Sequence, residues 1–182
     1  LRLKPVFLNR LERIGRERRL IYSTLMTTGL RVGELRQLRW NALELSGVKQ
    51  TLTVEASTSK SGKTDTLPLR SDLADLLRQW RADCGEPEPN SSVFHVSKDL
   101  LRAFDADLAV AGIDKTDSAD RKMDLHAIRH TTATHLAKAG VAPRAAQAIM
   151  RNSKIDLTMR VYTDPRLLDL AGAVEALPGL GA

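Results

Sequence analysis

Apolar residues recur with helical spacing near the start of the chain. Between residues 16 and 27 they predict one helix, on the positions Leu20, Ile21, Leu25 and Met26. Gly29 follows directly, and glycine favours the left-handed conformation in which many helices end. A second, short helix is predicted around residues 33–38, so a tight turn with Arg31 in its middle joins the two.

The next segments change from helical spacing to partial alternation. Residues 48–55 and 64–69 are rich in Thr and Val and predict two strands of a β-hairpin, joined by the basic loop "STSKSGK". Ser71 is predicted to cap a helix over residues 72–81. The segment "CGEPEPNSS" then predicts an exposed loop.

Further helices are predicted over the rest of the chain, at residues 99–111, 126–139, 143–150, 157–162 and 165–176. Pro143 stands at a first-turn position, where proline is tolerated, and Gly140 separates two of these helices. The pattern therefore predicts an α+β fold that is mainly α, with one small antiparallel sheet.

Length and composition narrow the class of protein. A chain of 182 residues with 42% hydrophobic residues predicts a single domain. It has one cysteine, no apolar run of 18 residues and no signal peptide pattern, which disfavours a disulfide scaffold, a membrane protein and a secreted one. We expect a cytoplasmic, nucleoid-associated protein. Since the chain begins at Leu1, a preceding segment is expected to be missing.

Charge is distributed unevenly around a net charge of +6. Residues 1–41 hold 10 basic and 3 acidic side chains, and residues 120–166 hold 9 basic and 4 acidic ones. The segment between them is acidic, since residues 71–119 hold 5 basic and 10 acidic side chains. Two basic segments could form one face for double-stranded DNA, although an unevenly charged surface would give the same numbers. Only 4% of residues are aromatic, which disfavours recognition of single strands by base stacking.

The stretch "LHAIRHTTATHL" offers two readings. His126 and His130 are four residues apart and could bind a metal, but Ala127 stands where zinc peptidases have glutamate, and Arg129 lies inside the motif. We therefore expect no metal or other cofactor. His126 and Arg129 share a helix face, a display that suits an anionic group such as phosphate. His130 and His135 are expected to be structural.

Three other residues could join such a site. A guanidinium at Arg31 would give phosphate a second bidentate partner, although an ion pair with Glu34 is the simpler explanation. Lys60 in the hairpin loop could reach DNA and protonate a leaving oxygen, or could simply be solvated. Tyr162 in "TMRVYTD" could pack in the fold or act as a nucleophile.

Together, these motifs resemble the tyrosine recombinase (phage-type integrase) family, specifically its C-terminal catalytic domain, from about residue 11 to residue 164. The matching stretches are "TGLRVGEL" around Arg31, a lysine ahead of "LPL", "LHAIRHTTATHL" and "TMRVYTD". The resemblance implies catalytic roles for Arg31, Lys60, His126, Arg129, Asn152 and Tyr162. It gives Glu34 a supporting role, and we expect DNA contacts from Lys60, Lys63, Arg151 and Lys154.

The same resemblance implies a mechanism. Tyr162 would attack a DNA phosphodiester to form a 3′-phosphotyrosyl link without metal or ATP, two arginines would stabilise the transition state, and Lys60 would protonate the 5′-oxygen. The family usually has "GHS" where this chain has Arg151-Asn152-Ser153. A catalytically impaired DNA-binding domain is therefore one alternative, and a type IB topoisomerase is another.

Domain organisation and partners also follow from the resemblance. Residues 1–182 are predicted to form one catalytic domain, and the family's N-terminal core-binding domain is expected to be absent from this chain. Residues 165–182 would dock on a neighbouring subunit or fold back on their own domain. We expect a homotetramer on double-stranded DNA, a monomer without DNA, and no membrane partner.

Overall fold

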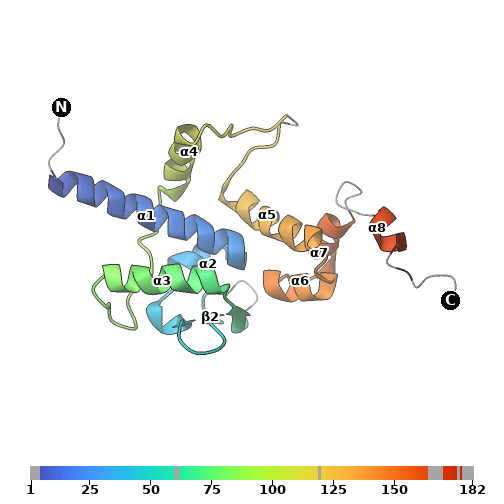
Figure 1. Ribbon diagram of the computed structural model, residues 1–182, viewed down its shortest axis with the longest axis horizontal. Helices are drawn as coiled ribbons and strands as arrows, with labels where there is room; N and C mark the ends of the chain where they lie inside the picture. The colour runs from blue at the N-terminus through green and yellow to red at the C-terminus, as the bar shows by residue number, and fades with distance from the viewer. Residues whose placement is uncertain (1–4, 60–61, 119, 164–169, 176, 178–182) are drawn as a thin grey trace. The chain divides into compact units, whose positions relative to one another are not determined.

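The structure is a computed structural model that describes residues 5–59, 62–118, 120–163, 170–175 and 177. It divides into two compact units, Leu1–Thr132 and Ala133–Ala182, and the boundary falls within helix α5 (Leu125–Lys138). The mainly helical α+β fold with one small antiparallel sheet is confirmed (Figure 1).

The first unit begins with two helices joined by a glycine turn. Helix α1 (Pro5–Thr28) ends at Gly29, whose φ of 61° is left-handed, and α2 (Val32–Arg36) follows. Both helices were predicted, but α1 begins about three turns earlier than its buried stripe indicates. The reason is that Leu8 and Leu11 are exposed, so this part of the helix has no buried face for the pattern to reveal.

A three-stranded antiparallel sheet follows a short 3-10 helix, η1 (Trp40–Ala42). Its order is β1-β2-β3, from β1 (Leu43–Glu44), β2 (Thr51–Val54) and β3 (Asp65–Pro68). The predicted hairpin is β2 and β3, in a register that pairs Thr53 with Thr66. Strand β1 was missed because two residues are too short to show alternation.

Two helices, α3 (Ser71–Asp83) and α4 (Leu100–Val110), complete the first unit before α5. The prediction that Ser71 caps α3 is wrong, because Ser71 is its first helical residue and Arg70 takes the cap position. Asp72 instead accepts a hydrogen bond from the Leu73 amide at 2.8 Å. The core contains Ile21, Leu25, Leu35, Leu52 and Leu77, and Trp80 donates to the Val93 carbonyl at 2.9 Å.

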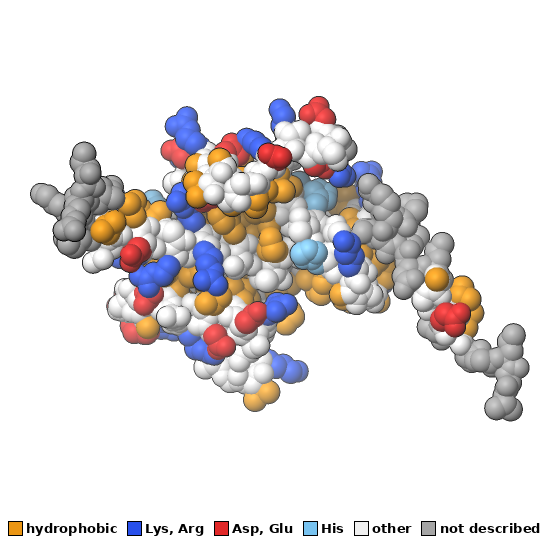
Figure 2. Space-filling view, turned by 45° about the horizontal axis from the view of Figure 1, so that its top comes forward, with side chains coloured by type: hydrophobic (Ala, Val, Ile, Leu, Met, Phe, Trp, Pro, Cys, Tyr) orange, Lys and Arg blue, Asp and Glu red, His pale blue; other side chains and the backbone are white. Residues whose placement is uncertain are grey.

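Acidic residues of the middle segment pair with basic residues of α1 in this unit. Arg16 contacts Asp83 at 2.9 Å, and Arg18 contacts Asp107 at 3.2 Å. On the face drawn in Figure 2, Lys and Arg side chains lie among Asp and Glu side chains. Part of the charge of the basic N-terminal segment is therefore balanced within the fold.

The second unit contains the end of α5 and the helices α6 (Pro143–Met150), α7 (Ile155–Tyr162) and α8 (Leu170–Glu175). Helices α6 and α7 pack against each other. The helix predicted over residues 165–176 is found at α8, and the rest of that prediction lies outside the described residues. In the described part of the chain, every helix is too short or too polar to cross a membrane.

Candidate active site

Arg31 is held by an acidic residue one turn later. It occupies the N-cap position of α2 with extended backbone, and its amide donates to Glu34 Oε2 at 2.8 Å. Its guanidinium also donates to Glu34 Oε1 at 2.9 Å, and the Glu34 side chain is only 3% exposed. The ion pair considered from the sequence is therefore present, but Arg31 keeps 29% of its side chain exposed.

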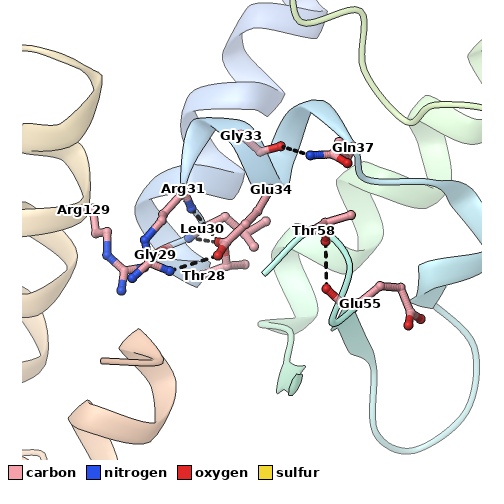
Figure 3. A network of polar contacts seen from close by, with 10 residues as sticks. All are labelled: Thr28, Gly29, Leu30, Arg31, Gly33, Glu34, Gln37, Glu55, Thr58 and Arg129. Carbon is pink, nitrogen blue, oxygen red and sulfur yellow. Dashed lines mark hydrogen bonds and ion pairs between the residues drawn. The ribbon is translucent and has the colours of Figure 1, made fainter. Parts of the chain in front are cut away.

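Arg129 reaches the same turn from α5. Its side chain is buried, and Nη1 donates to the carbonyl of Gly29, one hundred residues earlier in the chain. In Figure 3, Arg129 points at Gly29, two residues before Arg31. One glycine turn thus carries Arg31 and binds Arg129. That both guanidiniums bind one phosphate stays a prediction.

Two histidines lie on the exposed side of α5. His126 and His130 are both exposed, and their ring centroids are 5.0 Å apart with the planes at 86°. The pKa of His130 is lowered, chiefly by partial burial of its ring and then by the neighbouring His126 and Arg129. His126 lies one turn before Arg129, but His126 is exposed whereas Arg129 is buried. That the two side chains act together on one phosphate stays a prediction.

Sequence reasoning missed two residues that fix α5. Asp124 precedes the helix, and its carboxylate accepts a hydrogen bond from the Ala127 amide at 2.7 Å. Thr132 is buried and donates to the Met26 carbonyl of α1 at 2.8 Å. The signal for Asp124 was available, since an aspartate just before a predicted first turn favours a cap. Threonine in mid-helix is common, so Thr132 gave no signal.

The hairpin loop between β2 and β3 is described only in part. Lys60 lies outside the described residues, so its predicted role stays a prediction. Lys63 is exposed, and Gly62 has a φ of 66°. Thr58 donates to the Glu55 carbonyl at 3.0 Å, which closes the first turn of the loop (Figure 3).

In the second unit, Asn152 lies at the junction between α6 and α7. Its side-chain amide donates to Thr158 Oγ1 at 3.1 Å, and its backbone carbonyl accepts from the Gln147 side chain at 3.0 Å. Arg151 ends α6 with a left-handed φ of 49° and is buried, whereas Lys154 is exposed. Lys154 therefore has the exposure that a DNA contact needs, and Arg151 does not.

Tyr162 is the last residue of α7. Its side chain is half-buried, and its hydroxyl oxygen is buried with no hydrogen-bond partner among the described residues. This burial raises the pKa of Tyr162. The phenol is therefore neutral near pH 7, and a nucleophilic role needs an incoming group that accepts or removes its proton.

Comparisons with known proteins agree with these motifs. Residues 7–167 match the model of the phage integrase family. The chain is 32% identical over 145 residues to a tyrosine recombinase of Pseudothermotoga lettingae, covering 76% of this chain and 46% of that protein. The chain spans about half the length of the curated relatives it matches.

Solved structures share the fold at lower identity. The crystal structure of XerA recombinase matches with a TM-score of 0.69 at 22% identity, covering 98% of this chain and 66% of that one. A Tn1549 transposon integrase in complex with transposon right end DNA matches with a TM-score of 0.64 at 19% identity, covering 96% and 64%. With its family model matched over most of its length, this chain belongs to the phage integrase family.

Proposed function

We propose that this chain is the catalytic part of a site-specific DNA recombinase. It cleaves and rejoins double-stranded DNA through a 3′-phosphotyrosyl intermediate on Tyr162, without metal or ATP. The observation that carries this proposal is the turn from Gly29 to Glu34, which presents Arg31 and binds Arg129 from α5. Two guanidiniums at one turn match the oxygens of a single phosphate.

Each remaining residue has a role in the proposed reaction. Arg31 and Arg129 stabilise the charge that grows on the non-bridging oxygens, and His126 assists there as donor or base. Lys60 protonates the leaving 5′-oxygen, and Asn152 donates one further hydrogen bond. The phosphotyrosyl link retains the energy of the broken bond, so the 5′-hydroxyl can attack it and reseal the strand.

The partners follow from the same proposal. The solved Tn1549 integrase carries DNA, which supports DNA as the substrate here. The exposed Lys63 and Lys154 contact DNA phosphates, and Lys60 is a further candidate. Arg151 is buried, so it contacts DNA only if its side chain becomes exposed on binding. Recombination needs two duplexes, so we propose a homotetramer on DNA, a monomer without DNA, and action at the nucleoid in the cytoplasm.

A covalent-trapping experiment tests the proposal. The 182-residue chain is incubated with labelled, nicked DNA duplexes that carry a randomised segment, and adducts that survive denaturing electrophoresis are sequenced. Cleavage near the nick releases a short strand, which prevents resealing and accumulates the adduct. We expect an adduct from the parent chain and none from Tyr162→Phe, whose affinity for DNA stays within about twofold because phosphate contacts dominate binding.

A second substrate tests Lys60 alone. A DNA with a 5′-bridging sulfur has a leaving group that needs no proton, so Lys60→Ala should cleave it at nearly the parent rate while failing on normal DNA. Lys63→Ala is the matched control from the same loop and should behave alike on both substrates. Equal impairment of Lys60→Ala on both would exclude Lys60 as the general acid.

A DNA-binding module without catalysis is the second candidate, and the second unit favours it. Asn152 already donates to Thr158, and burial disfavours ionisation of Tyr162. The same trapping experiment separates the two functions. A recombinase gives an adduct that depends on Tyr162, whereas a binding module gives only a reversible shift in a native gel.

A further inference from the structure

His126 and His130 form an exposed pair on the first two turns of α5. They are four residues apart, so one helical turn brings their side chains to the same face. The ring centroids are 5.0 Å apart, and both side chains are exposed. The pair is therefore accessible from solvent and preassembled by the helix.

The distance between the two ring centroids equals the distance expected for two imidazoles that bind one metal ion. With Zn–N bonds of about 2.0 Å and tetrahedral angles, two imidazole centroids around one zinc ion lie roughly 5 Å apart. Imidazole is a preferred ligand of Zn²⁺, Ni²⁺ and Cu²⁺. We propose that His126 and His130 form a binding site for one divalent transition-metal ion of the zinc type.

This site differs from the zinc-peptidase site that the sequence disfavoured. Ala127 stands in the place of the general-base glutamate, and the described residues contain no group of three or more His, Cys, Asp or Glu side chains that could hold a metal. Two protein ligands leave the other positions to water, so binding is weaker than at a structural zinc site. The ion is a reversible occupant rather than a cofactor of the reaction.

Occupancy has a consequence that rests on the proposed function. The ring nitrogen of His126 that binds the ion has no lone pair left to accept a proton, and the charge of the ion disfavours protonation of the ring. His126 therefore cannot act as a base while the ion is bound. Zinc therefore inhibits DNA cleavage, and a chelator restores it. Metal binding itself requires only the two rings and does not depend on the proposed function.

Calorimetric titration of the 182-residue chain with ZnCl₂ tests binding. We expect one ion per chain, and at least about tenfold weaker binding for His126→Ala and for His130→Ala. His135→Ala is the matched control, because His135 is exposed on the same helix but is five residues from His130. His130→Gln, which keeps a polar side chain, should lose affinity equally. Binding that is absent, or that falls as much in His135→Ala, overturns the proposal.

Adduct formation with and without zinc tests the consequence. We expect micromolar to millimolar zinc to slow the parent chain at least about tenfold, and His130→Ala to cleave at the parent rate in EDTA and to resist zinc. Equal inhibition of both chains overturns the blocking role. If no version cleaves in EDTA, the proposed function fails, while the titration by itself still confirms or overturns the metal site.

Discussion

The two units hold the side chains of the proposed site in opposite ways. In the first unit, Arg31 and Arg129 are held by Glu34 and by the Gly29 carbonyl before any substrate arrives. In the second unit, the Tyr162 hydroxyl is buried without a partner among the described residues. The difference suits the proposed reaction. Arginines that bind a phosphate gain from being fixed in advance, whereas a nucleophilic tyrosine needs a partner that accepts its proton, which the incoming substrate would have to supply.

The largest expected effect on the rate of DNA cleavage comes from changing the guanidinium of Arg129. Arg129→Lys keeps the charge but loses the planar pair of donors, and we expect the rate of adduct formation to fall about a hundredfold. Arg36→Lys is the control, since Arg36 lies on α2 and donates to backbone carbonyls away from this turn. Single-turnover trapping measures the rate of adduct formation for both variants. An Arg129→Lys variant as fast as the parent would show that the paired donors of the guanidinium are not needed.

Substitutions of Asn152 test whether the second unit contributes a hydrogen-bond donor to the reaction. Asn152→Ala removes the donor that now binds Thr158, and we expect a loss of about 1–3 kcal/mol of transition-state stabilisation, which is roughly five- to 150-fold in rate. Asn152→His should raise the rate modestly. Thr158→Val is the informative partner variant, because it releases the Asn152 amide without removing it. An unchanged rate in Asn152→Ala would mean that the amide only joins α6 to α7.

Glu34 tests whether Arg31 depends on its internal partner. Glu34→Gln keeps an oxygen that can accept from the Arg31 amide but removes the negative charge, and we expect about a tenfold slower cleavage. DNA affinity should change less than the rate, because the variant disturbs the orientation of the Arg31 guanidinium while the positive charge of Arg31 is retained. Asp72→Gln alters an exposed ion pair with Arg70 and should leave both unchanged. Parallel losses in rate and affinity would argue against a positioning role.

The smallest expected effect is on the pH dependence of the free energy of unfolding, through Tyr22. Burial and a 2.8 Å hydrogen bond to Asp107 raise the pKa of Tyr22. Because the folded pKa exceeds the unfolded one, this bond contributes stability below about pH 10 that is lost as pH rises further. Urea unfolding at about pH 8 and about pH 11 should show a smaller loss of stability for Tyr22→Phe than for the parent. An equal loss would place the pH dependence elsewhere.

The sequence predicted the helices and the hairpin because their buried faces repeat with a fixed period. It failed at β1, which is too short to repeat, and at the first turns of α1, where Leu8 and Leu11 are exposed. It suggested a shared role for Arg31 and Arg129 from the chemistry of guanidinium and phosphate, and then from the order of the motifs. Nothing in the sequence indicated that the Gly29 carbonyl binds Arg129, because a backbone acceptor has no residue signature.

The bond between Arg129 and Gly29 also has an electrostatic consequence. Gly29 follows the last residue of α1, a helix of 24 residues, so its carbonyl lies at the negative end of the helix macrodipole. A cation at such an end gains about 0.3–1 kcal/mol, and up to about 2 kcal/mol when partly buried. The C-terminal end of the α1 dipole thus helps to stabilise the buried positive charge of Arg129. Shortening or fraying the last turn of α1 would weaken this interaction, and so would disturb the proposed phosphate-binding site without changing Arg31 or Arg129 themselves.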